Sequence, residues 1–485
     1  MHEDFEACYR ALSSRDARFD GRFFTGVTST GIYCRPVCPA QTPRRANVRF
    51  YRTAAAAEAA GFRACRRCHP HLAPGVVRHP AGDSVADRAL RLLAAGAGDG
   101  AGGVAAVAER LEVSDRHLHR VLRDAVGGGA LALARMRRLQ AARDLIEHTR
   151  MPITDVAFSA GYSSLRQFNN EVRSGMGASP SELRRRGHVN PGGDGAIVLR
   201  LAVRPPFDGG ALLGFFAARA VSGVESCSGG ALTRSVRLPH GAAVVQLEPG
   251  DTRLTVRLWL DDVRDLGAAV EGCRRLFDVD ADPEAIAAVL GADRLLAPLV
   301  TARPGLRVPG ALDGEEIAIR AVLGQQVTVG RATALAARLC ERLGTPLAEP
   351  RLGVDRLFPG AIAVAAADLD GLGLTAERAA TLRRVTAALA RGEVDLGPGA
   401  DAARARSALL TLRGVGDWTA SYIVMRALRD PDAFPAGDAG LRRGFARAGG
   451  DPRHLADRAQ RWRPWRAYAT VHLWQQPPVP PETRS

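Results

Sequence analysis

The sequence predicts a multidomain α+β protein, and three observations support this prediction. The chain has 485 residues, enough for three or four domains of ordinary size. Its composition is 46% hydrophobic and 24% charged, which is typical of segments that bury a core and excludes a disordered chain. The residue pattern changes along the chain, so we expect a small cysteine-rich domain, an all-α domain, a small antiparallel β/α domain and a second all-α domain.

The domain boundaries follow these changes of pattern. The breaker-rich stretch RRGHVNPGGDGA at 185–196 predicts a linker. Beyond it, alternating runs at Ala243–Leu247 and Leu254–Leu260 predict strands, and a helix is expected at Leu266–Leu276. The expected domains are therefore 1–75, 83–187, 196–300 and 301–476, followed by a disordered proline-rich tail at 477–485.

The charge balance points to a polyanionic partner. The 66 basic residues outnumber the 51 acidic ones, so the formal net charge is +15. An excess of this size favours nucleic acid as the partner, although a genome rich in arginine codons would also produce it. All of the basic residues are arginine, so the chain has no side-chain amine for a Schiff base. Mechanisms that need a catalytic lysine are excluded.

The N-terminal sequence and the cysteines indicate a compartment. No run of about 18 apolar residues occurs, and the start MHEDFEACYR lacks the basic and apolar regions of a signal peptide. We therefore expect a cytoplasmic protein with no membrane partner. Four of the eight cysteines cluster, and in a cytoplasmic chain a cluster favours a metal site over disulfides.

The clustered cysteines form two close pairs. Cys34 and Cys38 lie in GIYCRPVC, and Cys65 and Cys68 lie in ACRRC. Each pair fits a short turn, and two such turns can bring four sulfurs onto one tetrahedral Zn²⁺. A site that only holds the domain together is the simpler interpretation, because most four-cysteine sites are structural. Arginine between the ligands allows a second interpretation, since it lowers thiol pKa values and binds phosphate.

The stretch FTGVTSTGIYCRPVCPAQTPRRANVRFYRTAAAAEAAGFRACRRCHP closely resembles the N-terminal zinc domain of the Ada family of methylation-repair proteins. The resemblance covers about 50 residues and includes all four cysteines. It implies that Cys34 is both a zinc ligand and the acceptor of a methyl group from a DNA methylphosphotriester, in a single turnover. Cys38, Cys65 and Cys68 would be the supporting ligands of one structural and catalytic Zn²⁺, and we expect Arg44 and Arg45 to contact DNA.

The chemistry of such a site is consistent with this role. Zinc keeps sulfur as a thiolate at neutral pH, and a thiolate attacks the electrophilic methyl carbon of a phosphotriester. Zn²⁺ with four thiolates has a net charge of about −2, which repels phosphates. Methylation of one sulfur removes one negative charge, so we expect the affinity for DNA to rise.

The second domain contains the same pattern of two helices joined by a turn twice. In VAAVAERLEVSDRHLHRVLRDAVG (104–127), apolar residues recur at helical spacing and Ser114 is a candidate N-cap. About fifty residues later, ITDVAFSAGYSSLRQFNNEVRSGMGASPSELRR repeats this layout, with a turn from Ala157 to Gly161 and a helix near Ser163–Arg173. An ordinary helical bundle is the alternative to two helix–turn–helix units.

The duplicated layout and the terminal GASPSELRR resemble AraC-type DNA-binding domains. The resemblance implies that the second helix of each unit enters the major groove. The residues expected to contact bases or phosphates are Arg120, Arg166, Gln167 and Asn169.

The C-terminal half contains a glycine-rich turn and a set of aromatic residues. LRGVGDWTASYIVMRAL (412–428) has Gly414 and Gly416 between helical stretches, where backbone N–H groups could bind a phosphate. It is followed by DAFPAGDAGLRRGF (432–445) and RWRPWRAYATVHLWQ (461–475). Over about 195–475, this set resembles AlkA-type 3-methyladenine DNA glycosylases of the helix–hairpin–helix superfamily. A plain helix–helix turn is the alternative for the glycines alone.

This second resemblance implies residue roles. The essential aspartate of the family falls on Asp438, which would stabilise oxocarbenium charge at C1′, although the residue could also be only an N-cap. Trp418, Tyr422 and Trp474 would form an electron-rich pocket that binds cationic 3-methyladenine and 7-methylguanine. Trp462 and Trp465 are assigned to the core. Bifunctional relatives carry a lysine where this chain has Trp418, so monofunctional hydrolysis is expected.

The sequence differs from the family motifs at two points, and it allows one alternative function. The wedge position of the LGQxV segment holds Gln326 in place of leucine, and no Pro-Cys-His-Arg motif of O6-methylguanine transferases occurs. We expect a DNA alkylation repair and adaptive-response regulator that acts as a nucleoid-associated monomer on alkylated and promoter double-stranded DNA, with RNA polymerase as a further partner. The alternative is a zinc-stabilised AraC-type regulator whose C-terminal half is a non-catalytic DNA clamp.

Overall fold

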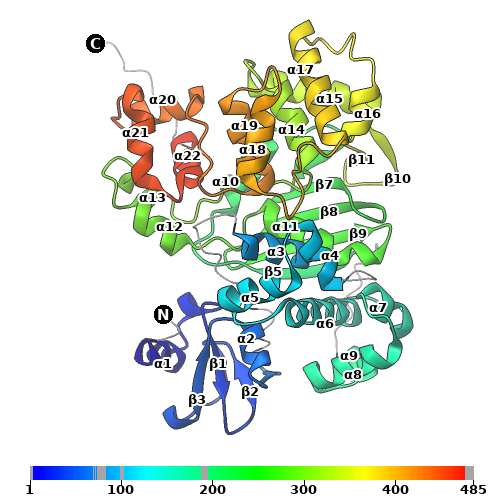
Figure 1. Cartoon of the computed structure of the whole chain (residues 1–485), viewed down its shortest axis with the longest axis vertical. Helices are drawn as coiled ribbons and strands as arrows, with labels where there is room; N and C mark the ends of the chain where they lie inside the picture. Colours follow the sequence, from blue (N-terminus) through cyan, green and yellow to red (C-terminus); the bar gives the residue numbers. More distant parts are fainter. Residues whose placement is uncertain are drawn as a thin grey trace. The chain divides into compact units, whose positions relative to one another are not determined.

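Short apolar runs separated by turns form a small sheet at the N-terminus. The computed structural model describes residues 4–68, 70, 73, 84–98, 103–186 and 195–475 (Figure 1). The strands of its first sheet lie in the order β3-β1-β2-β4. β1 is antiparallel to β2 and β3, whereas β2 and β4 are parallel. The elements are α1 (Phe5–Ser14), β1 (Phe24–Val27), β2 (Ile32–Cys34), β3 (Val48–Tyr51), α2 (Ala54–Ala59) and β4 (Arg63–Ala64).

The chain divides into two compact units. The first contains the described residues up to Arg204 together with Arg237–Arg274, and the second contains Pro205–Val236 and the described residues from Arg275 onward. The predicted linker at 185–196 falls largely outside the described residues, and the predicted tail at 477–485 falls wholly outside them.

The helical part of the first unit contains both predicted helix–turn–helix units. Ser114 caps α5 by accepting from the backbone N–H of His117, and Ser164 caps α8 in the same way through Gln167. Gly161 has a φ of 87°, which a turn can demand of glycine at little steric cost. The helices are α3 (Val85–Ala94), α4 (Gly103–Arg110), α5 (Asp115–Val126), α6 (Ala130–His148), α7 (Ile153–Ser159), α8 (Leu165–Met176) and α9 (Pro180–Arg186).

The alternating runs after the predicted linker form strands, as expected. In the first unit, β9 pairs antiparallel with both β5 and β8, and in the second unit β6 pairs antiparallel with β7. A helix occupies Leu266–Leu276, where one was predicted. The elements are β5 (Ile197–Ala202), β6 (Glu225–Ser228), β7 (Ala231–Arg237), β8 (Ala242–Pro249), β9 (Arg253–Leu260) and α11 (Leu266–Leu276).

The second unit is mostly helical. A two-stranded sheet of β10 (Thr345–Arg351) and β11 (Val354–Leu357) interrupts the region where only helices were expected. None of the helices in the described ranges combines the length and apolarity that a bilayer crossing requires. The α-helices are α10 (Gly209–Ala217), α12 (Pro283–Leu290), α13 (Ala297–Ala302), α14 (Gly314–Leu323), α15 (Val329–Leu343), α16 (Ala361–Ala366), α17 (Ala376–Ala390), α18 (Ala402–Thr411), α19 (Asp417–Ile423), α20 (Ala439–Arg447), α21 (Leu455–Ala459) and α22 (Arg466–Trp474).

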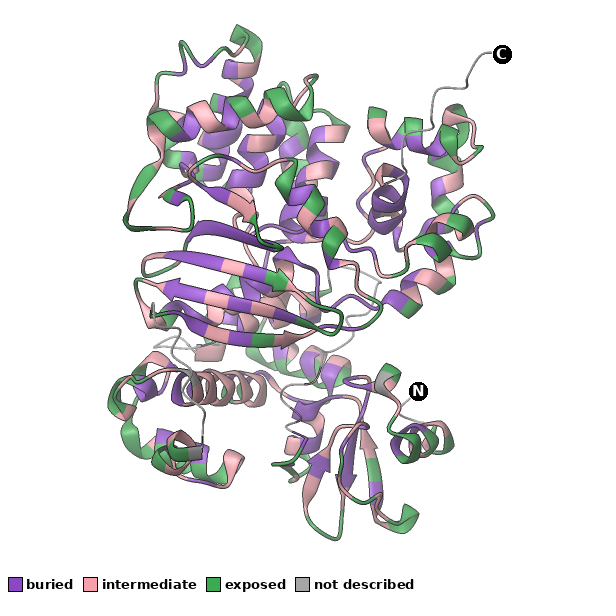
Figure 2. Ribbon diagram, turned by 180° about the vertical axis from the view of Figure 1, so that it is seen from behind, coloured by how far each residue is buried: buried purple, intermediate pink, exposed green. Residues whose placement is uncertain are grey.

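One hydrophobic core runs through this unit. α22 is buried along nearly its whole length, as the purple ribbon in Figure 2 shows. Trp462 is fully buried and Trp465 is 5% exposed, so both belong to the core as predicted. Nε1 of Trp462 donates to Asp293 at 2.9 Å, which satisfies its buried N–H.

Three buried charges and the partly exposed Arg320 form a closed network within the second unit. Arg234 pairs with Glu225 at 2.9 Å and with Glu316 at 2.5 Å, and Arg320 bridges the same two carboxylates at 2.9 and 2.8 Å. Arg320 also donates to the backbone carbonyl of Arg219 at 2.5 Å. The network therefore ties β6, β7 and α14 to the segment that directly follows α10.

Replacement of one member should destabilise this unit strongly. Arg234→Met leaves two buried carboxylates short of a partner, and breaking a buried pair in this way costs about 3–5 kcal/mol. We expect a large fall in the denaturant midpoint of the second unit, measured by tryptophan fluorescence. Arg453→Met is the matched control, because its pair with Asp451 is exposed, and it should leave the midpoint unchanged. Equal midpoints for the two variants would contradict the prediction.

His472 on α22 should make stability depend on pH. Burial lowers the pKa of this imidazole to about 4, with a smaller contribution from Arg303. The folded chain therefore stays neutral at His472 while the unfolded chain takes up a proton below its ordinary pKa of about 6.5. The free energy of unfolding should fall by roughly 1.4 kcal/mol per pH unit between about pH 6.5 and 4.

The measurement is urea unfolding at several pH values for the wild type and for His472→Gln. The variant should lose this part of the pH dependence, because glutamine does not titrate. The exposed His454, in the same unit, provides the matched control, and His454→Gln should keep the wild-type slope. An unchanged slope in His472→Gln would contradict the prediction.

Candidate functional site

Four sulfurs converge beside the small N-terminal sheet. Cys34 ends β2, Cys38 lies in the turn that follows, and Cys65 and Cys68 follow β4. The four Sγ atoms all lie within 4.8 Å of one another, and those of Cys38 and Cys65 are 3.9 Å apart. Tetrahedral zinc, with Zn–S bonds of about 2.3 Å, needs sulfurs about 3.8 Å apart. The residues therefore fit zinc.

The thiols also need a cation. The neighbouring sulfur of Cys38, and after it that of Cys68, raises the pKa of the Cys34 thiol. Packed this closely, the four sulfurs can all be thiolates only when a bound cation offsets their charge.

Cys34 differs from the other three cysteines. It is half-buried, whereas Cys38, Cys65 and Cys68 are 5–8% exposed. Each of those three accepts a backbone N–H hydrogen bond, from Ala40, Arg67 and Arg35 respectively. In the part of the chain that the structure describes, Cys34 accepts none. Hydrogen bonds stabilise a thiolate and reduce its reactivity, so Cys34 is the most accessible of the four sulfurs and the one that backbone hydrogen bonds stabilise least.

A cavity of about 400 Å³ opens beside Cys34. Arg63, Arg66 and Arg67 line it, and all three side chains belong to exposed residues. Nη2 of Arg66 donates to the backbone carbonyl of Gly177 at 2.5 Å. The sulfur therefore lies in a cationic cavity that suits a phosphodiester backbone.

A second site lies in the second unit, around Asp438. This residue caps α20, accepting from the backbone N–H of Leu441 at 2.6 Å. Its two carboxylate oxygens also accept from the indole N–H groups of Trp418 and Trp474, each at 2.9 Å. Both interpretations of Asp438 are thus compatible, because the cap and the two indoles hold one half-buried carboxylate in a fixed orientation.

The predicted aromatic residues meet around this carboxylate. Trp418 and Tyr422 stack with ring centroids 5.4 Å apart and an interplanar angle of 14°. The ring centroids of Tyr422 and Trp474 are 6.4 Å apart, and the two rings are tilted relative to each other. Trp418 and Tyr422 were expected to share a helix face, and in the structure they do.

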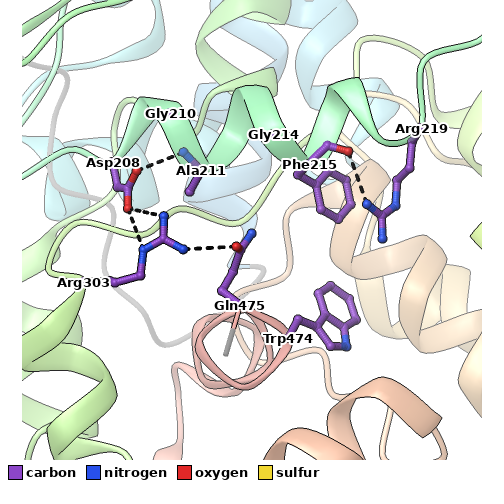
Figure 3. Close-up of a pocket in the computed structure, with 9 residues that line it drawn as sticks. All are labelled: Asp208, Gly210, Ala211, Gly214, Phe215, Arg219, Arg303, Trp474 and Gln475. Atoms are coloured by element: carbon purple, nitrogen blue, oxygen red, sulfur yellow. Dashed lines mark hydrogen bonds and ion pairs between the residues drawn. The ribbon is translucent and has the colours of Figure 1, made fainter. Parts of the chain in front are cut away.

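Two arginines that the sequence reasoning missed lie behind this aromatic wall. Arg426 donates to the Tyr422 hydroxyl at 2.7 Å, and its guanidinium lies 4.7 Å from the ring of Phe215. Arg219 lies 3.8 Å from the same ring (Figure 3). Burial alone would raise the pKa of Tyr422, but Arg426, Arg219 and Arg320 lower it overall. Part of the surroundings of the predicted electron-rich pocket is therefore cationic.

The glycine turn lies next to this pocket. Gly414 has a φ of 95°, and a Cβ there would lie 2.0 Å from Oγ1 of Thr381, so only glycine fits. Gly416 is the exposed N-cap of α19, the helix that carries Trp418. Gln325 donates to the carbonyl of Gly414 at 2.9 Å, which places the exposed Gln326, with a φ of 54°, beside the turn.

Comparison with known proteins identifies the family. The chain is 46% identical over 480 residues to the "probable bifunctional transcriptional activator/DNA repair enzyme AlkA" of Mycobacterium tuberculosis, covering 98% of this chain and 97% of that one. The chain belongs to this family of bifunctional Ada/AlkA proteins. It is also 35% identical over 276 residues to DNA-3-methyladenine glycosylase 2 of Escherichia coli, covering 56% of this chain and 94% of that protein.

Four family matches follow one another along the chain. They are the metal binding domain of Ada (7–71), a helix-turn-helix domain (107–186), the AlkA N-terminal domain (198–313) and the HhH-GPD superfamily of base excision DNA repair proteins (319–466). The 3-methyladenine DNA glycosylase of Archaeoglobus fulgidus has the same fold, with a TM-score of 0.50 and 20% identity over 57% of this chain and 97% of that one. The chain thus combines a zinc-binding, DNA-binding region with a DNA glycosylase.

The predicted DNA contacts of the first unit are all at its surface or partly exposed. Arg120 and Arg166 are exposed on α5 and α8, and Asn169 is exposed but donates to the carbonyl of Leu165 at 2.9 Å. Gln167 is half-buried and hydrogen-bonded to Ser163 and Glu171.

Arg44 and Arg45 differ in their surroundings. Arg44 is exposed, whereas Arg45 pairs with Glu6 and lies over the rings of Phe5 and Tyr9. Intramolecular contacts thus occupy Arg45, so Arg44 is the better placed of the two to bind a phosphate. Arg67 is one of the arginines between the ligands that the sequence pointed to, whereas sequence reasoning did not identify Arg63, whose only signal is its position two residues before Cys65.

Proposed function

We propose that the chain hydrolyses the N-glycosidic bond of alkylated purines such as 3-methyladenine and 7-methylguanine. The observation that carries this proposal is the Asp438 carboxylate, held by two indole N–H groups and a helix N-terminus at the edge of an aromatic pocket. Fixed donors prevent the carboxylate from turning away, so its charge is available as positive charge develops at C1′ of a flipped nucleotide.

The reaction needs no lysine. The bond between C1′ and the base nitrogen breaks, and its electron pair leaves with the base, which was cationic and becomes neutral. Water then forms the new C1′–O bond, and its proton passes to solvent. Asp438 stabilises the oxocarbenium charge between these events, and the product is an abasic site. Gln326, exposed beside the glycine turn, would fill the gap left by the flipped base.

We further propose that Cys34 accepts a methyl group from a DNA methylphosphotriester. Its exposure and its lack of a backbone N–H partner among the described residues support it over the other three sulfurs. Bound zinc would keep the sulfurs as thiolates. The Cys34 sulfur forms the new S–CH₃ bond, the C–O bond of the triester breaks, and its electron pair leaves with the phosphate oxygen. The acceptor is consumed, and Arg63 and Arg67 bind the flanking phosphates.

The methylated sulfur carries one negative charge less, so the cluster repels DNA less strongly. We propose that this increase in affinity lets the helix–turn–helix domain activate promoters together with RNA polymerase, with the protein acting as a monomer in the nucleoid.

The proposed domains are 1–75, 83–187, 196–300 and 301–476.

The full-length zinc-loaded chain can be tested for both activities. Incubation with methylated duplex DNA should release 3-methyladenine and 7-methylguanine, measured by liquid chromatography with mass spectrometry. Incubation with methylphosphotriester DNA should add one methyl group, located at Cys34 by peptide mapping. If no base were released, the C-terminal half would be a non-catalytic clamp, and a methyl group at Cys38 would overturn the assignment of the acceptor.

A further inference from the structure

The zinc-binding domain (7–71) and the helix–turn–helix domain (107–186) are in contact within the first unit. α2 packs against α6, and β4 lies against α8. On α6, Met136 packs against the small core of the zinc-binding domain, which consists of Phe24, Tyr33, Ala54 and Ala57. The contact therefore has an apolar part, and two hydrogen bonds extend it to the ends of α5 and α8.

The first of these hydrogen bonds is at the C-terminal end of α5. Thr53, the N-cap of α2, donates from its hydroxyl to the backbone carbonyl of Val126, the last residue of α5. Thr53 is 2% exposed and Val126 is 3% exposed, so water competes little for this bond. A Cβ added at the buried Gly128 would lie 3.0 Å from Cβ of Ala55, closer than carbon atoms normally pack. The start of α2 and the end of α5 are thus held closely together.

The second hydrogen bond is at the C-terminal end of α8. Arg66, between the sulfur ligands Cys65 and Cys68, donates from Nη2 to the carbonyl of Gly177 at 2.5 Å. Gly177 is the C-cap of α8, with a φ of 64°, and a Cβ there would collide with the Arg66 guanidinium. Carbonyl groups at a helix C-terminus lack partners within the helix and attract cations, so a guanidinium is favourable at this position.

The two hydrogen bonds join one small domain to both helices that are expected to enter the major groove. The residues expected to read DNA lie in the N-terminal halves of these helices, Arg120 on α5 and Arg166 and Asn169 on α8. The zinc-binding domain holds the opposite ends. Two such helices must be about one turn of DNA apart to read successive segments of the major groove. A domain that is bonded to both limits how far α5 and α8 can move relative to each other.

We propose that Thr53 and Arg66 determine specificity by fixing the spacing of the two DNA segments that α5 and α8 read. This inference rests on the proposed promoter recognition and extends it to the arrangement of the DNA site. Both are positioning residues, because each acts through the helix end that it holds. The role differs from the charge change at Cys34, since it requires no methyl group.

The test uses duplexes that the full-length zinc-loaded wild type selects from a random-sequence library. Footprinting locates the two segments that are read. The quantity measured is the spacing ratio, which is the affinity for the selected duplex divided by the affinity for the same duplex with about five base pairs, half a turn, inserted between the segments. Non-specific attraction to phosphates contributes to both affinities and largely cancels in the ratio. The wild type should strongly prefer the selected duplex.

Arg66→Gln and Thr53→Val each remove one of the two hydrogen bonds and should lower the spacing ratio by about 2- to 30-fold. Arg49→Gln is the matched control for loss of charge, because Arg49 is exposed on β3 and does not line the cavity beside Cys34. Thr53→Ser keeps the hydroxyl. Both controls should keep the wild-type ratio, and zinc content and circular dichroism check that each variant is folded.

The inference is overturned if folded, zinc-loaded Arg66→Gln and Thr53→Val both keep the wild-type ratio. It is also overturned if each control lowers the ratio as far as the variant that it matches. If the wild type enriches no sequence, before or after incubation with methylphosphotriester DNA, the proposed promoter recognition is wrong, and the inference with it.

Discussion

Asp438→Asn is expected to lower the rate of methylpurine release by about 10²- to 10³-fold, equivalent to roughly 2.7–4 kcal/mol of transition-state stabilisation. Asparagine has the same shape but no negative charge, and its amide N–H₂ cannot accept from the indole of Trp418 or Trp474. The measurement is single-turnover release of 3-methyladenine from methylated duplex DNA.

Stability separates the catalytic role of this residue from its structural role. Asparagine is as good an N-cap as aspartate, so α20 should remain folded and the denaturant midpoint should change little. Asp451→Asn is the matched control, because Asp451 caps a short helix in the same way but is away from the aromatic pocket. It should release bases at the wild-type rate. If Asp438→Asn released bases equally fast, Asp438 would have no part in the mechanism.

Cys34→Ala is expected to abolish methyl transfer from methylphosphotriester DNA, because the reaction consumes one sulfur atom and no other cysteine of the cluster is as exposed. Mass spectrometry after incubation should show no added methyl group. The affinity for a promoter duplex should then no longer respond to methylphosphotriester DNA, since the charge change at the cluster cannot occur.

Three thiolates and a water molecule can still hold zinc, as in many three-ligand sites, so Cys34→Ala should retain the metal with reduced affinity. Zinc content measured on the purified variant checks this expectation. Cys227→Ser is the matched control, because Cys227 is half-buried and lies outside the cluster, and it should accept the methyl group normally. If Cys34→Ala still gained one methyl group, another residue would be the acceptor.

Local features of the fold could be predicted from the residues alone. Ser114 and Asp438 are N-caps where the pattern of the following residues indicates a helix start, and Leu266–Leu276 is a helix as its periodicity predicts. The β10–β11 hairpin could not be predicted in the same way. Its strand Thr345–Arg351 is mostly exposed and contains two prolines, so it has neither the alternation nor the composition of a typical strand.

The candidate sites show the same distinction between contacts that neighbouring residues determine and contacts between distant segments. Cys34 and Cys38, like Cys65 and Cys68, are close in sequence, and Trp418 and Tyr422 are one helical turn apart, so their proximity follows from chain geometry. Phe215 and Arg219 are more than two hundred residues from Tyr422 and Trp474, and no periodic pattern connects such distant segments.

The sequence by itself therefore determined the chemistry available to this protein: a four-sulfur zinc cluster, a glycine turn and a carboxylate at a helix start. Tertiary structure decided which sulfur is most accessible, which indoles hold Asp438, and which two arginines lie behind the aromatic residues of the pocket. The physical reason is that capping, turns and ligand spacing act over a few residues. Exposure, cavity shape and electrostatic potential depend on packing between segments that are distant in the chain.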